Sequence, residues 1–359
     1  MVWLLALPVW VVFWNAFRSD SFGRKISDKY YMVICAVALI FVMGLRSRYT
    51  GTMDTDNYIN VFEGARKYSS LSDYLSKTES LKDFFLFSEI GFSFYTWIAA
   101  KIFPQAQMFL VFTAIIVVSA TARFILLHSD DPLISWITFI CLGSMTFAMN
   151  GMRQALAMSI CLLSYRYVRE KKPIRFLLVV LLAVLFHKSA VIFALVYLMR
   201  NMKPNLKSIS VLLTGVILFL AFAERLAFLY DDMTGEDYAK GESFESGGLV
   251  TILIYLIAIV GILILCKDLK SSKNFLPLSL IIVGFSLYLG RFISTQIYER
   301  ISYYFAYFLM LIFPIMFRNL EQKTRLLVRI GFVLVCFALF AYRISNGVFV
   351  DFQMFWQEN

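Results

Sequence analysis

Charge is scarce in this chain, and the residue types that usually bind metals or nucleotides are scarcer still. Only 16% of the 359 residues are charged, two are histidines and five are cysteines. The sequence has no HExxH pattern, no cluster of histidines and cysteines, and no GxxxxGK loop. A nucleotide-driven reaction is therefore not expected, and the sequence gives no reason to expect a metal or another cofactor.

The few cysteines lie in or beside apolar stretches without metal-site spacing, so they are interpreted as small core residues. They are Cys35, Cys141, Cys161, Cys266 and Cys336. The net charge of +10 could indicate nucleic acid. In a chain this apolar it is better explained by cytoplasmic loops that face anionic lipid, and no nucleic-acid partner is expected.

Hydrophobic residues make up 60% of the chain, whereas soluble domains contain about 45–50%. Apolar runs of about 17–25 residues recur, and each is long enough to cross a bilayer core of about 30 Å. The runs are too continuous for the alternating strands of a membrane barrel. The sequence therefore predicts one all-α polytopic membrane domain over residues 1–359. The expected spans are 2–17, 30–45, 105–127, 133–149, 152–168, 174–199, 208–228, 249–266, 275–293, 301–317 and 325–343.

Lysines and arginines in short loops set the expected orientation, because such loops stay in the cytoplasm. On this assignment residues 46–104 form an outer loop with an interfacial or re-entrant helix at 90–103, and residues 229–248 form an outer acidic loop. The run 174–199 has basic residues at both ends, so it either crosses once or forms a hairpin with His187 at its outer turn. The chain then has about 10–12 transmembrane helices.

Ionisable residues near the outer ends of the spans form a mostly cationic set. Such residues are costly at membrane depth, so a set on one face predicts a functional site. Its members are Arg46, Arg48, Asp54, Asp56, Arg153, His187, Lys188, Arg291, Glu299 and Arg300. The arginines favour an anionic headgroup, above all phosphate or pyrophosphate, because guanidinium stays charged and binds phosphate oxygens bidentately.

Arg153 interrupts a long stretch that is otherwise free of charge. It comes at the start of an expected helix over 152–168, where Asn150 or Gly151 would cap the first turn and the free amides would add to the positive field. The alternative is an ordinary boundary arginine that snorkels to lipid headgroups. The adjoining Gln154 and the other outer arginines favour a binding role.

Two kinds of residue are candidates for a general base. His187 lies in LFHKSA between apolar runs, and imidazole accepts protons near neutral pH, although a hydrogen-bonded core histidine is the alternative. Asp54 and Asp56 share a face only if their segment is extended. A carboxylate there could act as a base, bind a sugar hydroxyl or a metal, or belong to a surface turn that follows Gly51.

Four stretches together resemble the EpsG-like family of bacterial exopolysaccharide polymerases, which belongs with the Wzy-type polymerases. They are GLRSRYTGTMDTDNY after the second span, NGMRQALA before a later span, LFHKSA inside a long apolar run and YERISYYF near the end. The resemblance covers roughly residues 30 to 320. The family usually has an arginine in the outer loop and, a few residues later, Gly-Thr-Asp. Here Met53 intervenes, which leaves open whether Asp54 or Asp56 is the equivalent carboxylate.

The resemblance implies a glycosyltransferase in the bacterial cytoplasmic (inner) membrane, similar to the large multi-span GT-C-like enzymes with outer catalytic loops. It would join oligosaccharide repeat units carried on undecaprenyl pyrophosphate into exopolysaccharide or capsule at the outer face. Membrane lipid surrounds such an enzyme, and flippase and chain-length regulator proteins are further candidate partners.

Applied to this sequence, the resemblance assigns roles to the outer residues. Arg153, Arg291 and Arg300, with Arg46 and Arg48 next, would bind the pyrophosphate leaving group and stabilise its developing charge. His187, Asp56 or Asp54 would take the proton of the acceptor hydroxyl. The remaining contacts to the sugar or to other parts of the substrate would come from Gln154, Lys188, Glu299 and Tyr298.

Three other functions fit parts of the pattern. A ligase of the O-antigen type would use the same kind of pocket to move a finished chain. A transporter of lipid-linked oligosaccharide would place its charges near the midplane and carry inverted repeats, and neither is visible. A membrane acyltransferase with His187 as base would leave the arginines without a role.

Overall fold

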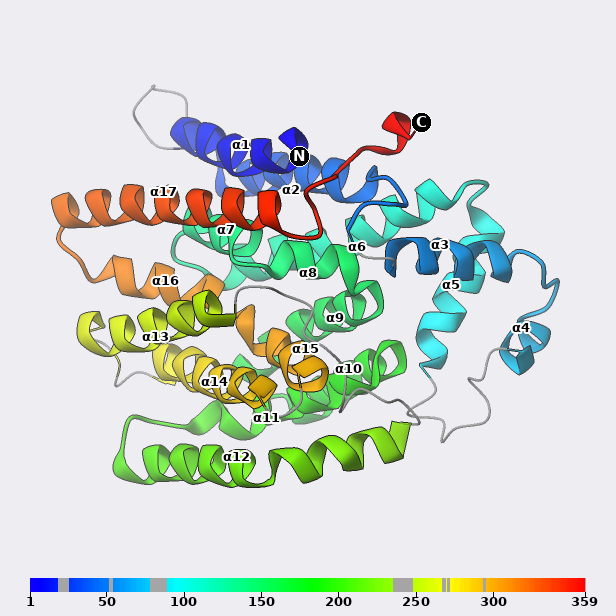
Figure 1. The fold of residues 1–359 in the computed structure, drawn as a ribbon. Coiled ribbons are helices and arrows are strands. Elements are labelled where there is room, and N and C mark those ends of the chain that lie inside the picture. Colours follow the sequence, from blue (N-terminus) through cyan, green and yellow to red (C-terminus); the bar gives the residue numbers. More distant parts are fainter. Residues whose placement is uncertain are drawn as a thin grey trace. The chain divides into compact units, whose positions relative to one another are not determined.

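The computed structural model describes residues 1–18, 26–51, 54–77, 89–234, 248–266, 269, 272–292 and 295–358. Within these ranges every regular element is a helix, and the one strand-like feature is an isolated antiparallel bridge between Arg46 and Met354. Figure 1 shows the helices in chain order. The predicted all-α fold is confirmed.

The helices form two compact units, each assembled from separate stretches of the chain. The first unit contains Met1–His128, Phe139–Val191 and Leu334–Asn359. The second contains Ser129–Thr138 and Ile192–Val333. The single membrane domain expected from the sequence stays a prediction.

In the first unit, α6 and α9 are the central helices. Helix α2 packs along α6, α6 packs on α9, and α9 packs on α10, while α1 covers α2. The bounds of these and the smaller helices are α1 Val2–Arg18, α2 Asp28–Gly44, α3 Asp54–Ala65, α4 Leu71–Lys77, α5 Ile90–Ile102, α6 Ala106–His128, α8 Ser144–Asn150, α9 Met152–Arg169 and α10 Pro173–Phe186.

In the second unit, α14 is the central helix and contacts α12, α13, α15 and α16. The bounds are α11 Ala194–Leu198, α12 Leu206–Thr234, α13 Gly248–Leu265, α14 Ser272–Leu289, α15 Thr295–Ala306 and α16 Leu309–Arg318. Among the described residues, two α-helices cross the division between the units, α7 Pro132–Cys141 and α17 Gln322–Asn346, and so does the 3-10 helix Lys188–Phe193. Asp130 pairs with Arg318 at 2.5 Å and Asp131 with Arg329 at 2.8 Å, which ties residues 129–131 to the rest of this unit.

Several helices match a membrane-spanning segment in length and composition. Among the described residues five helices qualify, or up to seven if each of two bent pairs counts as one span. The five are Ala106–His128, Leu206–Leu229, Gly248–Leu265, Asn274–Phe292 and Gln322–Asn346. Two shorter apolar helices are α1 and α10. The chain is thus a helical membrane protein, and the higher count of about 10–12 spans stays a prediction.

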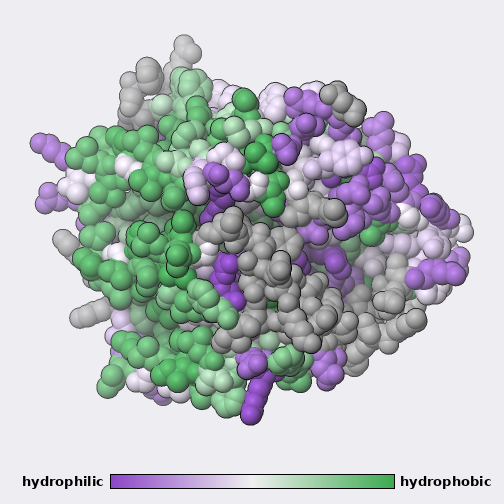
Figure 2. Space-filling model, viewed as in Figure 1, coloured by the Kyte–Doolittle hydropathy of each residue, from purple (hydrophilic) through white to green (hydrophobic). Residues whose placement is uncertain are grey.

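The apolar surface agrees with this assignment. Large hydrophobic side chains of α1, α10, α12, α13 and α17 are exposed, as expected where lipid replaces water. Figure 2 shows apolar side chains over much of the surface in view, whereas hydrophilic side chains gather at the side where α3 and α4 lie in Figure 1.

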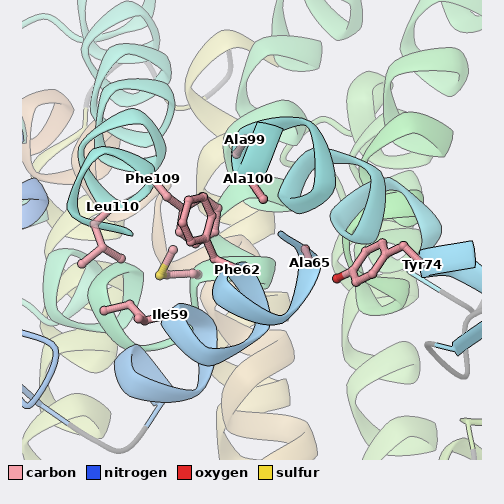
Figure 3. Packing of buried hydrophobic residues seen from close by; sticks show 9 residues of the cluster. Ile59, Phe62, Ala65, Tyr74, Ala99, Ala100, Phe109 and Leu110 are labelled. Carbon is pink, nitrogen blue, oxygen red and sulfur yellow. The ribbon is translucent and has the colours of Figure 1, made fainter. Parts of the chain in front are cut away.

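The polar segment between α2 and α5 is partly helical and packs against neighbouring helices. It contains α3 and α4, which pack onto α5, and α3 also reaches α6. Figure 3 shows their shared core, in which Phe62 of α3 stacks on Phe109 of α6 with ring centroids 5.1 Å apart. The segment is too short for a core of its own, so its apolar side chains are buried against α5 and α6.

Breaks in the predicted spans fall at identifiable residues. The span 133–149 is two helices bent by 50°, with Gly143 at φ +102° between them. The span 301–317 is bent by 42° between α15 and α16. Helix α12 continues to Thr234, although its candidate span ends at Leu229, where the acidic loop is expected to begin. The outer acidic loop stays a prediction, and its residues 235–247 lie outside the described residues.

Candidate functional site

The end of α10 places His187 in the first unit. The helix stops at Phe186, and His187 has extended backbone angles of φ −157° and ψ 120°. Its amide still donates to the Ala183 carbonyl at 3.0 Å, so the His187 backbone is fixed to the last turn of α10. A short 3-10 segment beginning at Lys188 follows. The run 174–199 is therefore interrupted at the predicted position.

Glu89 joins three helices at this point. It precedes the first residue of α5 and is only 8% exposed. One carboxylate oxygen is hydrogen-bonded to His187 Nδ1, and the other accepts a bond of 2.6 Å from Arg153 Nη1. The Lys188 amide donates to the same oxygen as His187, at 3.4 Å. The carboxylate thus links the ends of α5, α9 and α10.

The charges around Glu89 keep it ionised. Burial acts to raise the pKa of this carboxyl, but His187, Arg153 and Lys188 outweigh it and lower the pKa to about 2. A buried carboxylate needs such partners, since an isolated charge in this environment would be very costly. The cluster is therefore an anion held between three basic side chains.

Arg153 stands at the first turn of α9, as predicted. The helix begins at Met152 with Gly151 as its N-cap. The guanidinium lies 5.8 Å over the Phe92 ring and beside Tyr58, where it opposes the rise that burial causes in the Tyr58 pKa. The side chain is 41% exposed although its partner Glu89 is buried. Arg153 can therefore meet a ligand while it stays anchored to the protein.

A second predicted residue, Lys188, lies at the same cluster, and Gln154 lies beside Arg153 on α9. Lys188 is buried, at 4% exposure, and its charge contributes to the low pKa of Glu89. Gln154, which follows Arg153 on α9, is buried as well. The structure thus brings Arg153 together with His187 and Lys188 around Glu89, although Arg153 and His187 are 34 positions apart in the sequence.

Arg46 and Arg48 differ in their surroundings although they are two positions apart. Arg46 is buried and donates to the carbonyls of Met43 and Met149, the latter at 2.9 Å, and burial lowers its pKa to about 10. Arg48 is partly exposed and pairs with Asp56 at 2.6 Å, which raises the pKa of Arg48. Arg46 thus fixes backbone, and Arg48 is held by a carboxylate of α3.

Asp54 and Asp56 stand in the first turn of α3. The extended segment that would place them on one face is therefore not present, because residues two apart on a helix point about 200° apart. Asp56 accepts hydrogen bonds from Arg48 and from Asn60. Asp54 contributes to the electrostatic environment of Tyr58.

The remaining predicted residues lie in the second unit. Arg291 is buried, with its guanidinium 3.6 Å from the Glu299 carboxylate. Gly248, the first residue of α13, packs closely against Arg291, because a Cβ at this position would lie 2.7 Å from Arg291 Nη1. Tyr298 is buried beside Glu299, and Arg300 is half-buried. The structure divides the predicted arginines between the two units, and their common pocket stays a prediction.

Sequence reasoning did not identify Glu89. Its one local signal is a carboxylate directly before the apolar stretch 90–103. Acidic residues carry little weight in orientation rules, and both strong partners of Glu89 are far away in the sequence, at separations of 64 and 98 positions.

Fold and site together define a helical membrane protein with a buried carboxylate, a histidine and a half-exposed arginine at the ends of three helices. A family model described as the EpsG family matches residues 29–355. The chain therefore belongs to the EpsG family, and this membership suggests a polysaccharide polymerase role with glycosyltransferase-type activity. Comparison with curated proteins and with solved structures gave no significant match.

Proposed function

We propose that the chain polymerises polysaccharide at the outer face of the bacterial cytoplasmic membrane. Its substrates would be oligosaccharide repeat units linked to undecaprenyl pyrophosphate, and its product exopolysaccharide or capsule. Family membership supports the reaction class. The observation that carries the proposal is the cluster of Arg153, His187 and Glu89, which combines an anion-binding group with a base.

The proposed reaction is a substitution at the anomeric carbon of the donor sugar. An acceptor hydroxyl oxygen forms the new glycosidic bond, and the bond between that carbon and the pyrophosphate oxygen breaks. The bonding electrons leave with undecaprenyl pyrophosphate, whose negative charge grows as the bond breaks. Arg153 would bind these oxygens, since its guanidinium offers parallel donors to phosphate and is accessible on one side.

The acceptor proton would pass to His187. A ring that donates from Nδ1 to Glu89 has its Nε2 lone pair available as the base. Asp56 is the less suitable candidate because its two oxygens already accept bonds from Arg48 and Asn60. Asp54, on the same helix turn, stays an alternative base.

The other predicted residues keep proposed roles. Lys188 and Gln154 adjoin Arg153 and His187, and would contact the substrate near the pyrophosphate. Arg291 and Arg300 are proposed as further pyrophosphate ligands, followed by Arg46 and Arg48. Arg48 would have to release Asp56 to bind phosphate, and Arg46 would have to release the Met43 and Met149 carbonyls. Glu299 and Tyr298 are proposed as sugar contacts.

The test is to size the glycan of cells that lack the chain and of cells in which it is restored. Cells with the gene deleted should accumulate single lipid-linked repeat units, and the wild-type chain should restore long polymers on a sizing gel. Arg153→Ala and His187→Ala should insert normally yet leave single units. Lys67→Ala is the matched control, because it removes an exposed cation just after α3.

Two outcomes would contradict the proposal. Long lipid-linked chains that persist in the deletion would assign polymerisation to another protein and favour a ligase. Loss of all glycan from the outer face, with single units retained inside, would favour a transporter.

A further inference from the structure

We infer that Glu89 is a positioning residue, which fixes the His187 ring so that Nε2 faces the acceptor and which couples this ring to Arg153. The inference rests on the proposed function, because it concerns how the proposed base is prepared. It follows from the geometry of one buried carboxylate whose two oxygens serve two different functional side chains.

The contacts of Glu89 are specific for orientation. His187 Nδ1 and Arg153 Nη1 bind different oxygens, so the carboxylate plane sets the direction of both side chains. With Nδ1 as the donor to a carboxylate, the proton stays on that nitrogen and Nε2 becomes the acceptor. Carboxylates orient histidines in this way at metal sites and in catalytic triads.

The backbone around Glu89 is built to hold this arrangement. Glu89 has φ +49°, a left-handed conformation that is strained for a non-glycine residue. Two positions on, Gly91 lets α5 approach the last turn of α10, because a Cβ there would lie 2.8 Å from the Leu185 carbonyl oxygen. The close approach brings the start of α5 to the residue that follows α10, which is His187.

The same carboxylate links proton uptake to pyrophosphate binding. When His187 takes the acceptor proton, the imidazolium gains a direct ion pair with Glu89. The charged groups that face this ring are Glu89 from α5, Arg153 from α9 and the adjacent Lys188. A pyrophosphate bound to Arg153 would weaken the ion pair between Arg153 and Glu89. The Glu89 carboxylate would then stabilise the protonated His187 ring more strongly.

Glu89→Gln tests the coupling through the pH dependence of polymerisation in membranes. Loss of the carboxylate removes the ion pair with the imidazolium, so the acidic limb of the rate profile should move to lower pH. The maximal rate should fall at least tenfold, and Glu89→Asp should recover part of it. Asp73→Asn, which removes an exposed carboxylate of α4, should leave both quantities unchanged.

A second readout does not depend on activity. The chain has two histidines, so His128→Gln leaves His187 as the single imidazole. Nitrogen-15 NMR of histidine-labelled protein in membranes should show Nδ1 protonated and Nε2 unprotonated above neutral pH. Glu89→Ala should abolish this preference, whereas Asp73→Asn should keep it.

The two readouts separate the inference from the proposed function. If the wild-type chain does not polymerise glycan but Glu89→Ala changes the tautomer, the proposed function fails and the positioning role stands. If the tautomer and the pH profile are both unchanged in the Glu89 variants, Glu89 only supports the fold and the inference is overturned.

Discussion

Gly91 gives the sharpest prediction about how the site is assembled. Gly91→Ala adds a Cβ that would meet the Leu185 carbonyl oxygen at 2.8 Å and its carbonyl carbon and Cβ at 2.9 Å. Two of these atoms belong to backbone, which cannot rotate away. Ordinary contact begins near 3.4 Å, so α5 has to move from α10 by about 0.6 Å.

The expected cost has two parts. Overpacking of this kind costs about 1–3 kcal/mol, and the gain from replacing a helical glycine by alanine offsets at most about 1 kcal/mol. The net loss of unfolding free energy should be about 1–2 kcal/mol. Glu89 moves with α5, so its bond to His187 lengthens; displacements on this scale can reduce turnover by about tenfold to a hundredfold.

Gly64→Ala is the matched control. Gly64 lies within α3, and a Cβ there meets nothing within 4 Å. This variant should be as stable as the wild type or more stable by up to about 1 kcal/mol. Thermal unfolding in detergent and glycan sizing in complemented cells measure the two effects. Equal stability and equal polymer length for Gly91→Ala and Gly64→Ala would refute the reasoning.

Three further predictions concern residues around the site. Arg46→Met should lower the unfolding free energy by about 2–4 kcal/mol, because two buried carbonyls lose a charged donor; a fall in melting temperature no larger than for Lys67→Met would contradict this. Thr50→Val should cost about 1 kcal/mol in the same measurement, since Thr50 Oγ1 donates to the Gln353 carbonyl at 3.0 Å; Thr50→Ser should retain the bond, and equal effects of the two would count against it. The Glu89 carboxylate, whose pKa is lowered from 4.5 to about 2, should stabilise the fold above pH 4.5, and this contribution should disappear as the pH falls towards 2. The stability difference between wild type and Glu89→Gln should therefore shrink over that window, and a difference that does not change with pH would contradict the assignment.

Much of the helical framework follows from local sequence signals. The break before Arg153 is visible in Asn150 and Gly151, and α9 begins there. Basic residues at both ends of one apolar run indicate an interruption at His187, and α10 ends at the preceding residue. Both signals act within a few positions, which is why sequence reasoning places the two residues at helix ends.

Other features depend on contacts that sequence patterns do not contain. In the segment after α2, Ile59 and Phe62 have helical spacing, but only packing against α5 and α6 reveals their burial. Arg46 and Arg48 have similar local contexts, yet Arg46 is buried against two carbonyls and Arg48 meets a carboxylate. Glu89 becomes recognisable only once α5, α9 and α10 are brought together.

The most direct measurement of the central claim uses the purified full-length chain in liposomes. The probe is the lipid-linked glycan extracted from cells that lack the chain, and the product is sized on a gel. The wild type should convert single units into a ladder of longer chains, Lys67→Ala should do the same, and Arg153→Ala and His187→Ala should not. A wild-type chain that leaves the single units unchanged, or an Arg153→Ala, His187→Ala double variant that still makes the ladder, would contradict the account.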